Sequence, residues 1–194
     1  GVEEFGHYFQ EIQVPQSTAF HTQLNGRPYL VGPLARLNLN KWQLPEPVLE
    51  NLELTGIHFP SGNMFNSIMA RAVELHLAVY ESLRLLQGYR VPETPAVEFQ
   101  PRAGTAVSAS EAPRGVLWHS YEVDAGGRIV RAQIVPPTSQ NQSRIEEDLG
   151  NTLLHTGLEQ TDEVLRLLAE QVIRNYDPCI SCATHFLKLD VTRS

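Results

Sequence analysis

Two cysteines and a histidine near the C-terminal end of the chain have the residue types and spacing of a metal site. The segment reads Cys179-x-x-Cys182-x-x-His185, and the chain contains only two cysteines in all. Cysteines at this spacing can direct both sulfur atoms at one metal ion or at each other, and the histidine adds a third donor nearby. We therefore expect metal binding or thiol redox chemistry at this segment.

Three kinds of site are compatible with this spacing. A structural zinc site needs four protein ligands, but there is no further cysteine and the other histidines show no close pairing. A thioredoxin-type pair belongs on a strand-to-helix turn, whereas these cysteines follow an expected helix at the far end of the chain. The third kind is a shared metal centre whose remaining ligands lie elsewhere. These arguments disfavour the zinc site and the thioredoxin-type pair. The residues around the cysteines indicate whether the third kind of site is present.

The composition excludes several classes of partner. Of the 194 residues, 42% are hydrophobic and 19% are charged, and the formal net charge is −7. Phosphate binding requires clustered Lys and Arg, which are absent, so no nucleic-acid partner is expected. No apolar run approaches the roughly 18 residues of a membrane span. The cysteine usage and the lack of a signal peptide favour a cytoplasmic location, and the missing initiator Met suggests a start inside a longer sequence.

Hydrophobic periodicity predicts the elements that must position these residues. A helix is predicted from Asn66 to Gln87, with an apolar face formed by Phe65, Ile68, Met69, Ala72, His76, Val79, Tyr80, Leu83 and Leu86. A β-hairpin is predicted over 116–135, around a glycine turn. A second helix, capped by Thr161, must end by Tyr176 because a proline follows closely. The loop after that helix is expected to project the cysteines.

The remaining segments give weaker signals. Residues 8–29 predict short strands and loops, and the proline-rich stretch 31–60 is interpreted as a connector. Residues 88–112 hold three prolines and few apolar residues, which indicates a long ordered loop of the kind that lines a site. Ser143 and Glu146 have the spacing of a capping box at a helix start. The predicted fold class is α+β: a mainly helical lobe with a β-hairpin and minor strands.

The segment from Asp177 to His185 resembles the C-terminal signature of nickel–iron hydrogenase large subunits, Asp-Pro-Cys-x-x-Cys-x-x-His. Three further segments resemble motifs of that family, in the family's order: Gly-Pro-Leu-Ala-Arg at 32–36, Glu-Ala-Pro-Arg-Gly at 111–115 and Pro-Thr-Ser-Gln-Asn at 137–141. The resemblance covers almost the whole chain and implies that 1–185 is the C-terminal lobe of such a subunit. The sequences of the motifs at 32–36 and 137–141 are most similar to those of the cytoplasmic, bidirectional branch of the family, which passes electrons to NAD or another soluble carrier.

The resemblance implies metal-binding roles for the signature itself. Cys179 would bind nickel as a terminal thiolate, and Cys182 would bridge nickel and an iron that carries CO and cyanide; each thiol must lose its proton to bind. His185 would reach a magnesium or similar divalent ion near the site. A complete family member holds two more cysteines nearer its N-terminus, so half of the thiolate ligands are expected from elsewhere.

Residues outside the signature would surround the iron. The resemblance places Pro113 and Arg114 over its diatomic ligands, with Arg114 donating to one cyanide and Thr138 or Ser139 to the other. Asp177 would hold the arginine through a charge-assisted pair. Taken singly, each has an ordinary alternative: a surface ion pair, turn chemistry, or a cap after a helix. The occurrence of all four motifs together favours the hydrogenase site.

The implied activity is that of an oxidoreductase acting on H2, by reversible heterolytic cleavage to protons and electrons. The Cys179 thiolate is the preferred proton acceptor, with Arg114 as an orienting partner because a guanidinium stays protonated. The implied partners are the N-terminal half of the large subunit, a small iron–sulfur subunit, and an electron-carrier module using NAD, F420 or a related carrier.

The chain by itself is expected to be inactive, and the tail 186–194 is expected either to be cut off on maturation or to persist. The alternative function is a non-catalytic scaffold or assembly protein of the hydrogenase or complex I related family, which binds partners without metal.

Overall fold

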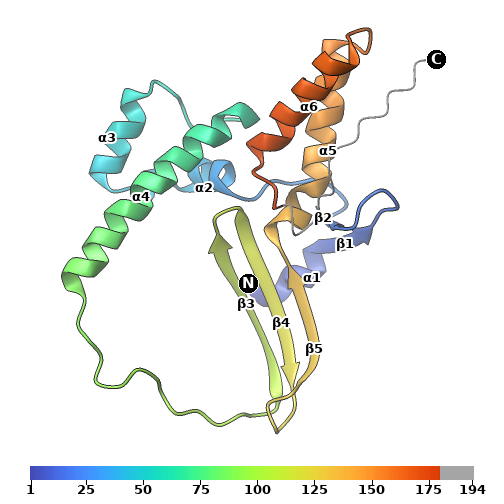
Figure 1. Cartoon of the computed structure of the whole chain (residues 1–194). Helices are drawn as coiled ribbons and strands as arrows, with labels where there is room; N and C mark the ends of the chain where they lie inside the picture. Colours follow the sequence, from blue (N-terminus) through green and yellow to red (C-terminus); the bar gives the residue numbers. More distant parts are fainter. Residues whose placement is uncertain (180–194) are drawn as a thin grey trace.

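The protein is described by a computed structural model that covers residues 1–179 (Figure 1). Its helices over this range are α1 (Phe5–Tyr8), α2 (Pro33–Asn40), α3 (Glu46–Leu54), α4 (Ser67–Gly88), α5 (Pro137–Thr156) and α6 (Asp162–Asn175). Its strands are β1 (Phe9–Gln13), β2 (Phe20–Leu24), β3 (Gly104–Ala112), β4 (Gly115–Val123) and β5 (Ile129–Val135). The expected α+β class, mainly helical with minor strands, is confirmed.

The strands form two antiparallel sheets. β1 pairs with β2, which confirms the short strands predicted within 8–29. β3, β4 and β5 form a second sheet in that order. The predicted hairpin over 116–135 is confirmed as β4 and β5. The loop predicted at 88–112 is wrong from Gly104 onward, where β3 begins. β3 is an edge strand of small residues with mostly exposed side chains, so it lacks the apolar alternation that identifies a strand.

Three helices begin at or next to a proline, and sequence reasoning missed each of these starts. The connector predicted over 31–60 contains α2 and α3, which carry Pro33 and Pro47 in their first turns. α5 begins at Pro137, so the predicted capping box at Ser143 lies inside the helix and is wrong. Proline is well accommodated in a first helical turn, because the backbone N–H that it lacks has no partner there.

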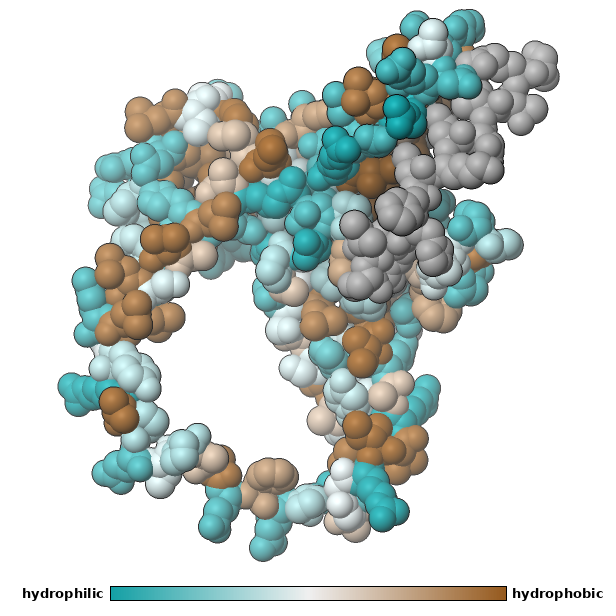
Figure 2. Space-filling model, viewed as in Figure 1, coloured by the Kyte–Doolittle hydropathy of each residue, from teal (hydrophilic) through white to brown (hydrophobic). Residues whose placement is uncertain are grey.

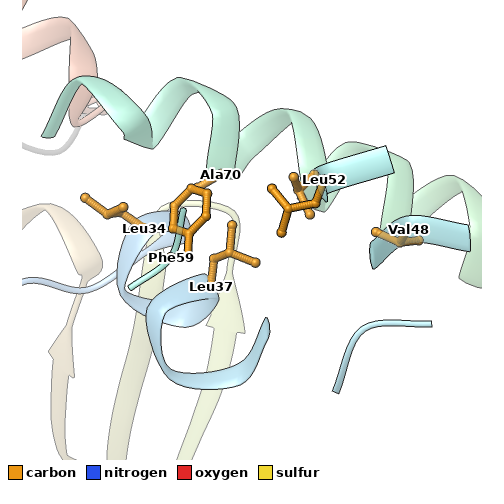
Figure 3. Close-up of a cluster of buried hydrophobic side chains, with 7 residues drawn as sticks. Leu34, Leu37, Val48, Leu52, Phe59 and Ala70 are labelled. Carbon is orange, nitrogen blue, oxygen red and sulfur yellow. The ribbon is translucent and has the colours of Figure 1, made fainter. Parts of the chain in front are cut away.

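The main hydrophobic core lies between α2, α3 and α4 (Figure 3). Its buried members are Leu34, Leu37, Val48, Leu52, Phe59, Ala70 and Val73. The helix predicted over 66–87 is confirmed as α4. Tyr80 of the predicted apolar face packs against the core, but most of that face does not. α4 turns Ala70 and Val73 inward, whereas Ile68, Val79 and Leu86 of the predicted face are 60%, 68% and 73% exposed.

α6 packs against α5, which continues from the end of β5, and both ends of α6 agree with the sequence (Figure 1). The Thr161 hydroxyl accepts a hydrogen bond from the backbone N–H of Val164, as expected of an N-cap. The helix ends at Asn175, which agrees with the prediction that it must end by Tyr176. Over residues 1–179, no helix is both long and apolar enough to cross a membrane.

Candidate metal centre

The turn between β3 and β4 carries the two residues expected over the iron. Ala112 pairs with Gly115, so Pro113 and Arg114 form the tip of a tight hairpin. This tip lies against the segment that leads into α2, because a Cβ added to Gly32 would be 2.8 Å from the carbonyl oxygen of Arg114. Gly32 has a φ of +111°, which side-chain-bearing residues rarely adopt. The two backbones therefore meet at a distance that only glycine permits.

Arg114 and Asp177 are brought together by the fold, as the sequence motifs implied. The Nε atom of Arg114 donates to the carbonyl oxygen of Asp177 and lies 3.2 Å from its Oδ2 atom. The two side chains are 41% and 48% exposed, so the ion pair contributes at most about 1 kcal/mol to stability. Its consequence is geometric, because it connects the β3–β4 turn directly to the cysteine-bearing segment.

The end of α6 is docked on the start of α4. The carbonyl oxygen of Asn175 accepts hydrogen bonds from the Ser67 hydroxyl and from Nη1 of Arg71, the latter at 3.0 Å. A cation at a helix C-terminus satisfies a carbonyl that has no helical partner and complements the helix dipole. α4 thereby determines where the chain leaves α6 toward the cysteines.

Tyr176 completes this anchor. It is buried, and its hydroxyl donates to the Asp148 carboxylate of α5 at 2.5 Å. Burial, followed by the hydrogen bond to Asp148, raises the pKa of Tyr176 far above its ordinary value, so the group stays a neutral donor. Asp177 then adopts a φ of +49°, a left-handed conformation that Asp tolerates better than most residues. This turn leads to Cys179, which is half-buried.

Thr138 and Ser139 occupy the first turn of α5 and are 4% and 3% exposed. Ser139 donates its hydroxyl proton to the Pro136 carbonyl at 3.0 Å and lies 3.3 Å from the Thr22 hydroxyl. A buried run of polar side chains requires partners inside the fold. The serine has these partners within its own helix start and in β2.

Sequence reasoning did not select Gln140 and Asn141, the last two residues of the same motif, as site residues. Asn141 makes two hydrogen bonds to the backbone of Val31: its Oδ1 accepts from the N–H at 2.9 Å, and its Nδ2 donates to the carbonyl at 3.1 Å. Val31 precedes the glycine that contacts the Arg114 carbonyl. The first turn of α5 is thus connected to the β3–β4 turn. The available signal in the sequence was the run of four polar residues, 138–141, that follows the Pro-Pro pair.

Gln140 is 1% exposed and joins three parts of the fold. Its Nε2 donates to the carbonyls of Val116 and Val135 at 2.6 and 3.2 Å, and its Oε1 accepts from the Tyr29 hydroxyl at 3.1 Å. Burial, with a smaller contribution from the charge of Glu11, raises the pKa of Tyr29 well above its ordinary value, so this hydroxyl remains a donor.

We expect Gln140→Leu to lower the free energy of unfolding by about 2–5 kcal/mol, because several buried partners lose their hydrogen bonds at once. Urea denaturation of the 194-residue chain measures this change. Gln171→Leu makes the same chemical change at an exposed position of α6 and should stay within about 0.5 kcal/mol of the unaltered chain. Equal effects of the two substitutions would contradict the buried network.

The structure therefore brings together part of the expected site. Arg114 contacts Asp177, two residues before Cys179, and Thr138 belongs to a helix start joined to the same region through Asn141. Cys182, His185 and the tail 186–194 lie outside the described residues. Within residues 1–179, no group of three or more His, Cys, Asp or Glu side chains is arranged to hold a metal ion. The described part alone does not contain a complete metal site.

The cysteine segment held at a helix end, with an arginine-bearing hairpin tip bonded to it, forms the described part of a candidate metal centre. The family model described as nickel-dependent hydrogenase matches residues 21–185. The chain belongs to this family. The motifs that carried the resemblance all lie inside the matched range.

Relatives and solved structures agree with this assignment. The chain is 33% identical to sulfhydrogenase 1 subunit alpha of Pyrococcus furiosus over 96% of this chain and 44% of that protein. It is 34% identical to the NAD-reducing hydrogenase HoxS subunit beta of Cupriavidus necator, over 81% of this chain and 34% of that protein. The structure matches an NAD+-reducing nickel–iron hydrogenase in the H2-reduced state with a TM-score of 0.72 and 27% identity, covering 95% of this chain and 43% of that one. The chain thus spans less than half the length of these relatives.

Proposed function

We propose that this chain is the metal-bearing C-terminal part of a nickel–iron hydrogenase large subunit, which cleaves H2 reversibly and heterolytically once it is completed by its partners. The observation that carries the proposal is the bonded contact between Arg114 and Asp177, which joins two separate family motifs two residues before Cys179. An isolated match to a cysteine motif would not require this contact.

The donor chemistry of the segment fits half of a nickel–iron centre. Cys179 and Cys182 supply soft thiolate ligands, which suit nickel, and His185 supplies an imidazole for a divalent ion nearby. When bound, the centre would polarise H2 and accept its electrons. The Cys179 thiolate would take up the proton, while Arg114 would donate hydrogen bonds to the diatomic ligands and stay charged.

The geometry also distinguishes Thr138 from Ser139, the two candidate donors of the second hydrogen bond to the diatomic ligands. Ser139 already donates its hydroxyl proton to the Pro136 carbonyl. Among the hydrogen bonds of the described residues, none is donated by the Thr138 hydroxyl. A hydroxyl has a single proton to donate. We therefore assign the donor role to Thr138 and a supporting role in the helix start to Ser139.

The exposed surface of α4 is the observation that supports the N-terminal half of the large subunit as a partner of this chain. Its outer stripe consists of exposed apolar residues at helix-packing spacing: Ile68, Ala72, Leu75, Val79, Leu83 and Leu86. Hydrophobic residues follow α4 in Figure 2. A helix that is apolar on two opposite faces belongs inside a larger assembly, because one face alone suffices to pack a surface helix. The relatives possess more than twice the length of this chain, which provides the covering segment.

We propose a cytoplasmic complex with a small iron–sulfur subunit and a soluble electron-carrier module. The proposal is supported by the relatives' names, which include an NAD-reducing and an F420-non-reducing hydrogenase. The net charge of −7 and the absence of a membrane-spanning helix over residues 1–179 are compatible with it.

The test compares the 194-residue chain alone with the same chain co-produced with the proposed N-terminal half of the large subunit, supplied by the same gene or as a separate chain, which would carry the second Cys-x-x-Cys. Both are prepared from a host with nickel-maturation proteins, and metal content and H2-dependent dye reduction are measured. We expect nickel, iron and activity only in the combined sample, because the chain alone offers two thiolates. Stoichiometric nickel with H2 oxidation by the chain alone would overturn the need for the partner. A combined sample without nickel would favour the scaffold alternative.

A further inference from the structure

Arg36 of α2 makes a hydrogen bond with every N–H group of its guanidinium. Nε and Nη2 donate to the two carboxylate oxygens of Glu74 at 2.7 Å each, and Nη1 donates to Oε2 of Glu111 at 2.6 Å. The two remaining donors reach backbone carbonyls, Ala112 at 2.9 Å from Nη1 and Pro113 at 3.0 Å from Nη2. Arg has five such donors, and all of them are used here.

The partners of Arg36 come from two parts of the chain that are far apart in the sequence. Glu74 lies on α4, whereas Glu111 and Ala112 are the last two residues of β3 and Pro113 begins the β3–β4 turn. The arginine side chain is only 20% exposed. Burial opposes its charge, but hydrogen bonds and charges from Glu74 and Glu111 outweigh burial and raise the pKa of Arg36. The group is therefore a permanently charged junction between two helices and the turn.

The β3–β4 turn has little else to hold it in place. β3 is an edge strand, and the segment 89–103 that leads into it arcs away from the rest of the chain (Figure 1). Apart from the bond between the Arg114 side chain and Asp177, its other close contact is with Val31 and Gly32, which approach the turn on the backbone side. A two-residue turn without such contacts moves freely, because its own hydrogen bonds fix only the flanking pair. The two carbonyls bonded to Arg36 directly precede Arg114.

We propose that Arg36 is a positioning residue that fixes the backbone of the β3–β4 turn, so that Arg114 is presented to Asp177 and to the metal centre. This role rests on the proposed function, since it acts through Arg114 and not by contact with the centre. A planar fork with five donors can hold two carboxylates and two carbonyls at once, whereas a lysine ammonium has three donors at a single point. Arg36→Lys keeps the charge and removes the fork.

The first experiment uses the 194-residue chain and needs no metal. Arg36→Lys should raise hydrogen exchange of the backbone amides at 112–116 by roughly 10–100-fold, because charge-assisted hydrogen bonds to the turn are lost. Exchange in α5 should stay unchanged. Arg84→Lys on α4 is the matched control, since Arg84 is 63% exposed and pairs only with Glu81 among the described ion pairs. Unchanged exchange at the turn, or an equal rise in every element, would overturn the proposal.

The second experiment uses the completed, metal-loaded complex. With Arg36→Lys we expect unchanged nickel content, shifted infrared bands of the cyanide ligands, and H2 oxidation reduced about 10–100-fold, as for other residues that orient metal-site groups. Arg84→Lys should alter none of these. Unshifted bands with full activity would overturn the role. If the unaltered complex lacked nickel, the proposed function would fail, and the exchange experiment would still decide whether Arg36 holds the turn.

Discussion

Cys179→Ser in the completed large subunit is expected to remove nickel and with it all measurable H2 oxidation. A serine hydroxyl keeps nearly the size of the thiol but remains protonated near neutral pH and is a hard ligand, whereas nickel in this role requires a soft thiolate. Loss of a residue that merely orients a ligand already costs 10–100-fold in metal affinity, so loss of the ligand should cost more than about 100-fold. Nickel content per subunit after desalting measures this directly.

The fold should survive this change. Cys179 follows α6 at a half-buried position, and the anchor formed by Tyr176 lies before it, so thermal unfolding of the 194-residue chain should not shift appreciably. Ser181→Ala is the control, because it alters a position between the two cysteines that has no proposed ligand role. Retention of stoichiometric nickel by the Cys179→Ser protein would refute the assignment of this thiolate.

Gly32→Ala is expected to destabilise the chain by about 2–5 kcal/mol, from backbone strain plus steric overlap. Gly32 has φ +111° and ψ −164°, in a region that is essentially restricted to glycine. The added Cβ would also lie 2.8 Å from the carbonyl oxygen of Arg114, which belongs to backbone and cannot rotate aside. Denaturant unfolding gives the loss of stability, and hydrogen exchange at the β3–β4 turn shows whether the turn is displaced.

Gly56→Ala separates the two contributions. Gly56 has a φ of +69°, but a Cβ there would meet nothing within 4 Å, so only the backbone penalty of about 1–2 kcal/mol applies. The Gly32 substitution should therefore cost more than the Gly56 substitution and should be the one that disturbs the turn. Equal losses, with the turn undisturbed in both, would show that the close approach of the two backbones has no energetic weight.

The contrast between α4 and the segment 31–60 shows which elements the sequence could predict. α4 has a long apolar repeat, and α6 has a threonine cap and a following proline, so both are encoded by neighbouring residues. α2 and α3 are short and contain prolines, which a sequence pattern marks as breaks. A proline in a first turn and a proline between elements look alike in the sequence, since only the hydrogen bonds of the folded chain distinguish them.

The sequence by itself determined the family. The order and spacing of residues around Cys179 and Cys182, with motifs at 32–36 and 137–141, specify it without any information on the tertiary structure. These signals are local, because a metal site needs particular side chains at short separations along the chain. The sequence also contained both apolar faces of α4, but it did not indicate which of them this chain buries.

Only the tertiary structure decided how the motifs cooperate. It joins Arg114 to Asp177, closes the guanidinium of Arg36 around the β3–β4 turn, and buries Gln140 as a junction between strands. Each of these contacts links residues that are distant in the sequence, and the same residue types form ordinary surface pairs in other proteins. The physical reason is that hydrogen-bond partners are selected by the packing of whole elements, which no local pattern of residues records.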